Sequence, residues 1–118
     1  MTPARAQPRR GEVWDVDFAP TRGHEQTGLR PALVISSDEY NKSPAGLVVV
    51  LPITKSIRNI PWHLRIAKGR SGLSHDSAML CDHIRSANVD RLAKQRGDIE
   101  SPVLEEAQQR LKYLLDIP

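Results

Sequence analysis

The sequence predicts a mainly β fold with some α structure: a small, strongly curved antiparallel sheet or barrel followed by one C-terminal helix. Short runs of alternating or β-branched residues recur along the chain, and glycine- and proline-rich connections separate them. A long pattern of helical spacing comes only after residue 100. A chain of 118 residues is long enough for one hydrophobic core, so we expect a single domain over residues 10–118.

Composition narrows the class of protein. Seventeen Lys and Arg against fourteen Asp and Glu give a net charge of +3, which leans mildly toward a polyanionic partner. Because Cys81 is the single cysteine, an intramolecular disulfide and a zinc site built on thiolates are excluded, and we expect a reducing, cytoplasmic location. No apolar run is long enough to span a membrane, and residues 1–9 are expected to form a disordered basic arm.

The first two strands are predicted on either side of a long loop. Residues 12–18 are rich in strand formers, and residues 32–35 form a short apolar run typical of a buried strand. Pro20, Gly23 and Gly28 interrupt the segment between them. Its length, roughly a dozen residues, exceeds that of a simple hairpin turn, so we expect a functional loop.

The middle of the chain contains the strongest strand pattern. Ser37 is predicted to cap a short helical turn at residues 38–42. The β-branched run Leu47–Thr54 follows; it is apolar on both faces and is therefore predicted to be the central strand. Pro52 is expected to mark a bulge or an edge near its end.

Three shorter strands and a helical turn are predicted after the central strand. Residues 62–66 and residues 77–86 both alternate, and in the second run Asp82 falls on the apolar phase. Residues 89–92 are predicted to form a single helical turn, and residues 94–99 a short last strand.

The C-terminal segment has the pattern of an amphipathic helix. Ser101 is the predicted N-cap, Pro102 suits the first helical position, and Glu105 and Glu106 lie where the helix dipole favours acids. An apolar stripe at helical spacing is predicted to dock on the sheet: Leu104, Ala107, Leu111, Leu114 and Leu115.

Four segments together carry a resemblance to a known family. They read RGEVWDVDF, PTRGHEQTGLRPALVIS, VVVLPIT and LCDHIRS, and in this order and spacing they resemble the MazF/PemK (Kid) toxin endoribonucleases of bacterial toxin–antitoxin pairs. The resemblance runs from Arg10 to the C-terminal helix. It implies a small SH3-like barrel of the CcdB/Kid type with a C-terminal helix.

The resemblance also implies an activity and partners. Members act as homodimers that cut single-stranded RNA at short sequences without a metal or another cofactor, leaving 2′,3′-cyclic phosphate and 5′-hydroxyl ends. A MazE-like antitoxin is the expected protein partner, and the chain is expected to associate with DNA only indirectly, through that antitoxin. One cousin of similar fold, the gyrase-poisoning toxin CcdB, is not a nuclease, so a non-catalytic toxin that binds a protein target is the alternative.

Arg30 and Thr54 are the first catalytic candidates. Attack by the 2′-hydroxyl of RNA needs a base, an acid and positive charge or donors at the phosphoryl oxygens. A guanidinium is always charged and can hold two phosphate oxygens, and the family reading assigns this role to the arginine of its Arg-Pro motif, here Arg30. Thr54 matches the Thr or Ser that partners it. The competing interpretations are a surface arginine that braces the loop and an ordinary strand threonine.

The identity of the general base stays open among three residues. Glu25 matches the glutamate implicated in MazF-like members, and His24 matches a histidine of the Kid-like branch. Asp82 matches the Kid-like base, but that branch has an arginine two residues earlier, where this chain has Leu80. Asp82 is therefore interpreted first as a structural or base-reading carboxylate, which needs a partner such as Arg85 or Arg30.

Further polar and aromatic residues are expected to contact RNA. Trp62 lies in a loop rich in cations and could stack on a base, whereas Trp14 is expected to be core. The histidines are too scattered to indicate a metal site. The expected RNA contacts are Gln26, Lys55, Ser56, Arg58, Trp62, His83 and Arg85. Further phosphate contacts are suggested, without specificity, at His63, Lys68 and Arg70.

Overall fold

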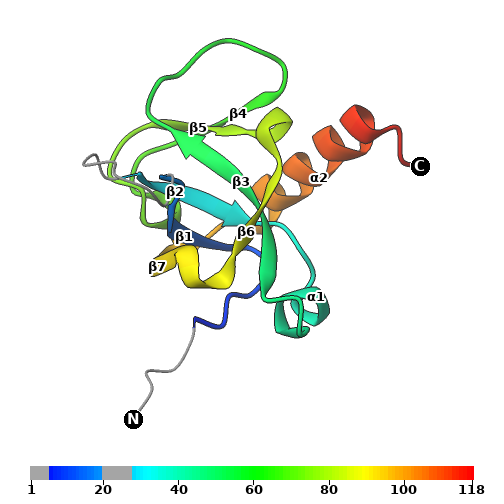
Figure 1. Cartoon of the computed structure of the whole chain (residues 1–118). Helices are drawn as coiled ribbons and strands as arrows, with labels where there is room; N and C mark the ends of the chain where they lie inside the picture. Colours follow the sequence, from blue (N-terminus) through cyan, green and yellow to red (C-terminus); the bar gives the residue numbers. More distant parts are fainter. Residues whose placement is uncertain (1–5, 20–27) are drawn as a thin grey trace.

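The protein is a curved antiparallel sheet with a C-terminal helix (Figure 1). A computed structural model describes residues 6–19 and 28–118. The mainly β fold class predicted from the sequence is confirmed. Within these ranges the strands do not hydrogen-bond into a closed ring: their order is β4-β5-β3-β2-β1-β7, and β6 pairs with β3. The strands are β1 (Glu12–Asp17), β2 (Leu29–Val34), β3 (Leu47–Thr54), β4 (His63–Ile66), β5 (Ser77–Leu80), β6 (Arg85–Asn88) and β7 (Leu92–Asp98), and the helices are α1 (Asp38–Lys42) and α2 (Ser101–Leu115).

Strand β3 is central, as predicted, because three other strands pair with it. Along one side it pairs with β2, in the register Ala32↔Pro52. Along its other side β6 pairs with its first half and β5 with its end. Pro52 lies where the partner on that second side changes, which fits a residue that cannot donate a ladder hydrogen bond.

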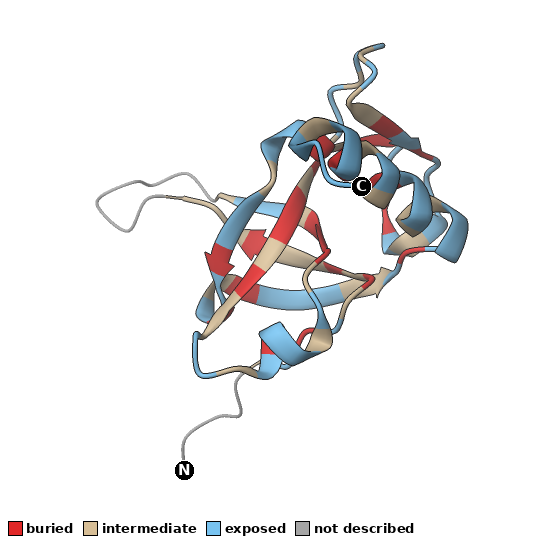
Figure 2. Cartoon of the chain, turned by 90° about the vertical axis from the view of Figure 1, so that its right-hand side faces the viewer, coloured by how far each residue is buried: buried red, intermediate tan, exposed pale blue. Residues whose placement is uncertain are grey.

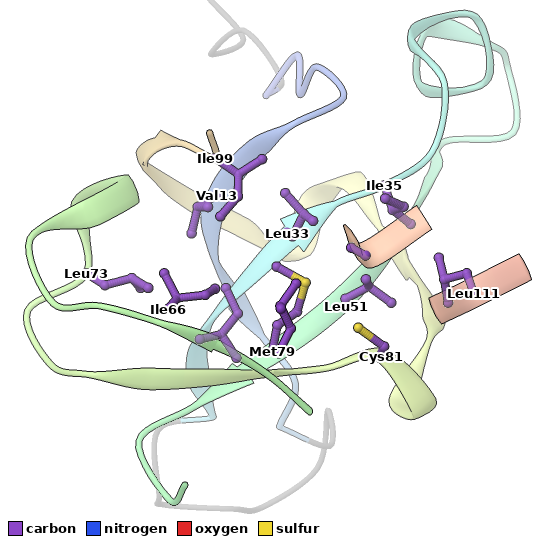
Figure 3. Close-up of a cluster of buried hydrophobic side chains, with 13 residues drawn as sticks. Val13, Leu33, Ile35, Leu51, Ile66, Leu73, Met79, Cys81, Ile99 and Leu111 are labelled. Carbon is purple, nitrogen blue, oxygen red and sulfur yellow. The ribbon is translucent and has the colours of Figure 1, made fainter. Parts of the chain in front are cut away.

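Both faces of the central strands are buried because the curved sheet encloses two hydrophobic clusters. Leu33 belongs to the larger cluster, whereas its neighbours Ala32 and Val34 belong to the smaller one, as alternation along a strand requires. The larger cluster includes Ala107 and Leu111 of α2, and Figure 3 shows Leu111 and Cys81 at its helix side. In the outer strand β4, by contrast, buried residues alternate with more exposed ones, and Figure 2 shows the distribution of burial over the whole sheet.

The predicted strand over residues 77–86 is wrong in its middle. The chain leaves the sheet after β5, forms a short 3₁₀ turn at Cys81–His83, and re-enters as β6. Met79 pairs with Ile53, and Arg85 pairs with Val50. The segment from Met79 to Arg85 is therefore longer than the facing segment of β3 from Val50 to Ile53, and its middle is looped out. Asp82 consequently lies on an exposed turn rather than on an apolar face.

Helix α2 begins one residue earlier than predicted. Glu100 is the N-cap and Ser101 the first helical residue; the Glu100 carbonyl accepts from the N–H groups of Val103 and Leu104, both at 3.0 Å. The predicted stripe is confirmed in its middle only, because Leu115 is 51% exposed. Ala107 and Leu111 are buried, and Leu104 and Leu114 pack partly buried against the core.

The remaining elements agree with the sequence to within a few residues. Ser37 caps α1 through a hydrogen bond from the Tyr40 N–H at 3.2 Å, as predicted. Of the segment predicted to be a disordered arm, residues 1–5 lie outside the described residues, whereas Pro8 is buried and the Arg9 N–H donates to Glu12 at 2.8 Å. Among the helices of the described residues, none has the length and apolar character needed to cross a membrane.

Candidate active site

Arg30 and Thr54 are brought together by strand pairing. Arg30 is the second residue of β2, and Thr54 is the last residue of β3. The register Ala32↔Pro52, continued by two residues along both strands, places them opposite each other. By alternation both side chains lie on the face of Ala32 and Pro52, at the end of the smaller cluster. The sequence-predicted pair is therefore held by rigid backbone rather than by a loop.

A hollow of about 540 Å³ opens beside this pair, and we call it the Arg85 hollow. Five residues predicted from the sequence meet there, although they come from three separate segments: Arg30, Thr54, Asp82, His83 and Arg85. Its apolar wall is formed by Phe18, Pro52, Ile53, Leu80 and Ile84. The hollow thus combines two cations, one carboxylate, one imidazole and one hydroxyl.

A second hollow of about 410 Å³ adjoins the first, and we call it the His63 hollow. The two share Thr54, Leu80, Asp82 and His83. The His63 hollow adds Ser56 and Arg58, both expected RNA contacts, together with Ile60 and His63. The site is therefore an elongated surface that passes Thr54, not one closed pocket.

A third hollow, the Arg96 hollow, lies against Arg30 and Thr54 as well and measures about 420 Å³. It contains Lys55, another expected RNA contact, and an ion pair in which the Arg96 guanidinium lies 3.5 Å from Asp15. Thr54 is thus common to all three hollows. Thr54 is therefore the residue at which the three hollows meet.

The two arginines of the Arg85 hollow, Arg30 and Arg85, differ in the interactions of their side chains. Arg30 is exposed, and although its backbone pairs with Val16, its side chain makes no hydrogen bond or ion pair with another residue that the structure describes. Arg85 instead places its guanidinium carbon 4.9 Å from the centre of the Phe18 ring, a cation–π arrangement. Among the described residues of this hollow, Arg30 is therefore the cation whose side-chain donors have no partner, and Arg85 is the one oriented by Phe18.

Asp82 has different neighbours from those expected. Its Oδ1 lies 3.7 Å from Nε2 of His63 and 3.9 Å from Nε2 of His83. No ion pair joins it to Arg30 or Arg85 within the described part of the chain, so the expected arginine partner is replaced by two imidazoles. The cause is the 3₁₀ turn, which directs residue 82 toward the start of β4.

Three of the expected site residues lie outside the described residues: His24, Glu25 and Gln26. Their proposed roles stay predictions. Across residues 6–19 and 28–118, no group of three or more His, Cys, Asp or Glu side chains is arranged to hold a metal ion.

The connection between β3 and β4 is anchored to α2. Trp62 stacks on Tyr113 with ring centroids 5.2 Å apart, and the Arg110 Nε donates to the Pro61 carbonyl at 3.0 Å. Figure 1 shows this connection arching over one end of the sheet. Trp62 lines none of the three hollows and has one ring face occupied by Tyr113, so its expected stacking on RNA stays a prediction.

Cys81 lies beside the site but is not a nucleophile in it. Burial raises the pKa of its thiol to about 11, although Arg110 lowers that pKa and Asp82 raises it further. Its side chain has no exposed surface. The thiol is therefore neutral and inaccessible near pH 7.

Sequence reasoning missed one residue of the site and did not foresee the surroundings of another. Phe18 supports Arg85, and the available signal was an aromatic residue at the end of a strand. His63 was expected only as a non-specific phosphate contact, whereas its side chain is 9% exposed and lies beside Asp82. Both contacts join segments that are distant in the chain.

Comparison with known proteins identifies the family. Residues 9–115 match the PemK-like, MazF-like toxins of type II toxin–antitoxin systems. The chain is 33% identical to Endoribonuclease MazF9 of Mycobacterium tuberculosis, with 92% of this chain and 97% of that protein covered. It is 31% identical to Endoribonuclease EndoA of Bacillus subtilis, covering 91% and 93% respectively. A MazE-MazF structure from Deinococcus radiodurans matches with a TM-score of 0.81 and 32% identity, over 96% of this chain and 99% of that one. The chain belongs to the PemK-like, MazF-like toxin family.

Proposed function

We propose that the protein is the toxin of a type II toxin–antitoxin system and acts as an endoribonuclease on single-stranded RNA. The observation that carries this proposal is the facing pair of Arg30 and Thr54 at the edge of the Arg85 hollow. The names of its relatives MazF9 and EndoA support an enzyme over a CcdB-like toxin that only binds a protein. By cutting messenger RNA the protein stops translation and growth.

Arg30 and Thr54 act on the scissile phosphate. The exposed guanidinium of Arg30 binds two phosphoryl oxygens and stabilises the negative charge that grows as the 2′-hydroxyl attacks. The Thr54 Oγ1 accepts a hydrogen bond from the Ser56 N–H at 3.1 Å, so the hydroxyl proton is directed to another acceptor, here a phosphoryl oxygen.

Cleavage requires only the RNA and side chains of this protein. The 2′-oxygen forms a bond to phosphorus while the bond from phosphorus to the 5′-oxygen breaks. The 2′-hydroxyl gives up one proton and the departing 5′-oxygen takes up one, so the products are a 2′,3′-cyclic phosphate and a 5′-hydroxyl end. Because Arg30 supplies the positive charge, the reaction needs no metal ion.

The base that takes the 2′-hydroxyl proton is one of Glu25, His24 and Asp82. Asp82 lines the same hollow as Arg30 and Thr54, which supports a place for its carboxylate close to the substrate. In the MazF-like scheme the general base is Glu25, and in the Kid-like scheme it is Asp82. Asp82 lies close to two imidazoles, which favours a role as a hydrogen-bond acceptor held in place rather than as the base. We therefore assign the base first to Glu25.

RNA and an antitoxin are the proposed partners. Solved MazE-MazF complexes from Deinococcus radiodurans support a MazE-like antitoxin as the inhibitor. The chain acts as a homodimer in the cytoplasm and associates with DNA only through its antitoxin. The residues proposed to bind RNA around the catalytic pair are Gln26, Lys55, Ser56, Arg58, Trp62, His83 and Arg85.

Incubation of the purified protein with a long single-stranded RNA in EDTA tests the proposal. We expect cuts at a short recurring sequence, with 2′,3′-cyclic phosphate and 5′-hydroxyl ends. The matched control pair is Arg30→Ala, which should be inactive, and Arg65→Ala, which alters an exposed arginine on β4 that lines none of the hollows. Strict dependence on Mg²⁺ contradicts the mechanism, and intact RNA together with inhibited gyrase supports the CcdB-like alternative.

A further inference from the structure

His63 has a largely covered polar side chain that the proposed chemistry does not use. Its side chain is only 9% exposed, and its Nδ1 is buried without a hydrogen-bond partner among the described residues. A buried nitrogen without a partner lowers stability, and an apolar side chain of similar size would avoid this cost. The hydrogen bonds of the described residues therefore supply no reason for a histidine rather than an apolar side chain at this position.

The backbone around His63 fixes the imidazole beside Asp82. His63 begins β4 opposite Leu80 of β5, and its N–H donates to the Ile60 carbonyl at 2.9 Å. On the facing segment, the Cys81 N–H donates to the Trp62 carbonyl at 3.0 Å. These bonds hold the two segments together directly before the turn that carries Asp82, whose Oδ1 lies 3.7 Å from the His63 Nε2.

The carboxylate of Asp82 retains an unused acceptor. Both neighbouring imidazoles, of His63 and His83, approach Oδ1, and the described residues supply no partner for Oδ2. Asp82 also lines the hollow next to Thr54, where Ile60 and Leu80 offer apolar contacts and Arg58 a cation. An apolar wall, a cation and one fixed acceptor suit a planar base with its adjoining phosphate.

We propose that His63 is a positioning residue that holds Asp82, so that the carboxylate reads one RNA base in the His63 hollow. This inference rests on the proposed function as an RNA-cutting enzyme. A carboxylate accepts hydrogen bonds from an exocyclic amino group, which cytosine, adenine and guanine carry and uracil lacks. His63 therefore selects, through Asp82, an amino-bearing base close to the cleaved bond.

Cut-site mapping on a randomised single-stranded RNA library tests this inference in four variants. In His63→Leu the base preference at one position should fall by about tenfold or more. Asp82→Asn should change the preference at the same position, and the double variant should be no worse than Asp82→Asn alone, because His63 acts through Asp82. His63→Gln, which keeps an N–H donor, should largely restore the preference.

Binding measurements keep the test decisive if Asp82→Asn cuts too slowly to map. Short oligonucleotides with a 2′-deoxy nucleotide at the cleaved position cannot react, so the affinity for each of the four bases can be compared in every variant. Arg65→Leu is the control, since Arg65 lies two residues further along β4 and is exposed. Thermal unfolding of each variant verifies that it is folded.

The outcomes separate the two proposals. An unmodified protein that does not cut RNA overturns the proposed function. If it does cut RNA, three results overturn the inference about His63: a uniform loss of rate at every site with the base preference unchanged, additive effects in the double variant, or a preference for uracil at the affected position.

Discussion

Arg30 faces Thr54 across two neighbouring strands, because the register that pairs Ala32 with Pro52 brings the start of β2 opposite the end of β3. One hydrogen-bonding register thus sets the position of both side chains. A slip of one residue in either strand would turn the side chain that we propose as catalytic to the other face of the sheet. The proposed site therefore depends on the same pairing that buries the centre of the sheet.

Replacing Arg30 by alanine should lower the rate of RNA cleavage by about 10²-fold or more, the effect of removing a charge partner of the transition state. The fold should survive, since this arginine is exposed. Initial rates on a single-site RNA measure the loss, and thermal unfolding measures the stability. Full turnover by the purified variant would refute the assignment.

Thr54→Ala should lower the cleavage rate by about tenfold or more, which corresponds to the net value of one hydrogen bond to a charged group. Thr54→Ser keeps the hydroxyl and should retain most of the activity. Comparison of the two rates on the same RNA separates the hydroxyl from the strand methyl group. Equal rates in both variants would show that the hydroxyl does not touch the phosphate.

The two schemes for the general base predict opposite orders of activity. If the MazF-like scheme holds, Glu25→Ala should lower the rate more than Asp82→Ala. The reverse order would favour the Kid-like scheme despite Leu80, which stands where that branch has an arginine. Single-turnover rates at saturating protein are the appropriate measure, because they exclude effects on binding.

Cys81 should make the protein less stable in alkali. Its thiol pKa is about 11 in the folded chain and near 9 when unperturbed, so between these pH values the unfolded thiol ionises while the folded one stays neutral. Unfolding is thereby favoured as pH rises, by up to about 3 kcal/mol for this group, and the full stability is present below pH 9.

Urea unfolding at a series of pH values from 8 to 11 checks this effect, with Cys81→Ala as the reference that cancels the other ionising groups. The difference between the two proteins in free energy of unfolding should shrink as pH rises. A constant difference would mean that the thiol ionises equally in both states. Iodoacetamide should leave the folded thiol unmodified at pH 8.

The protein should be a dimer of about twice 13.2 kDa by light scattering. Large apolar side chains remain exposed on the single chain, among them Leu29 and Tyr113. RNA affinity should fall steeply with salt, with a logarithmic slope of about −0.7 per phosphate neutralised. A micromolar monomer that still cleaves RNA fully would show that the site is complete within one chain.

The parts of the site that the sequence predicted are those governed by local pattern. The β-branched run Leu47–Thr54 identified the central strand, and the Arg-Pro step identified the strand entrance at Arg30. The alternation over residues 77–86 was misleading at Asp82, because that segment pairs with two separate parts of β3 and loops out between them. The burial of His63 depends on the β4–β5 register and on a connection held by α2, and neither is a local property.

The pairing of β1 with β7 has a consequence for synthesis. Val16 lies opposite Leu92 and Glu12 opposite Asp98, so an early strand of the chain gains its partner on that side only when β7 has left the ribosome. Asp82, His83 and Arg85 also follow Arg30 and Thr54 in the chain. The proposed site is therefore incomplete while most of the chain is still being translated, because the topology of the sheet places its last parts late in the sequence.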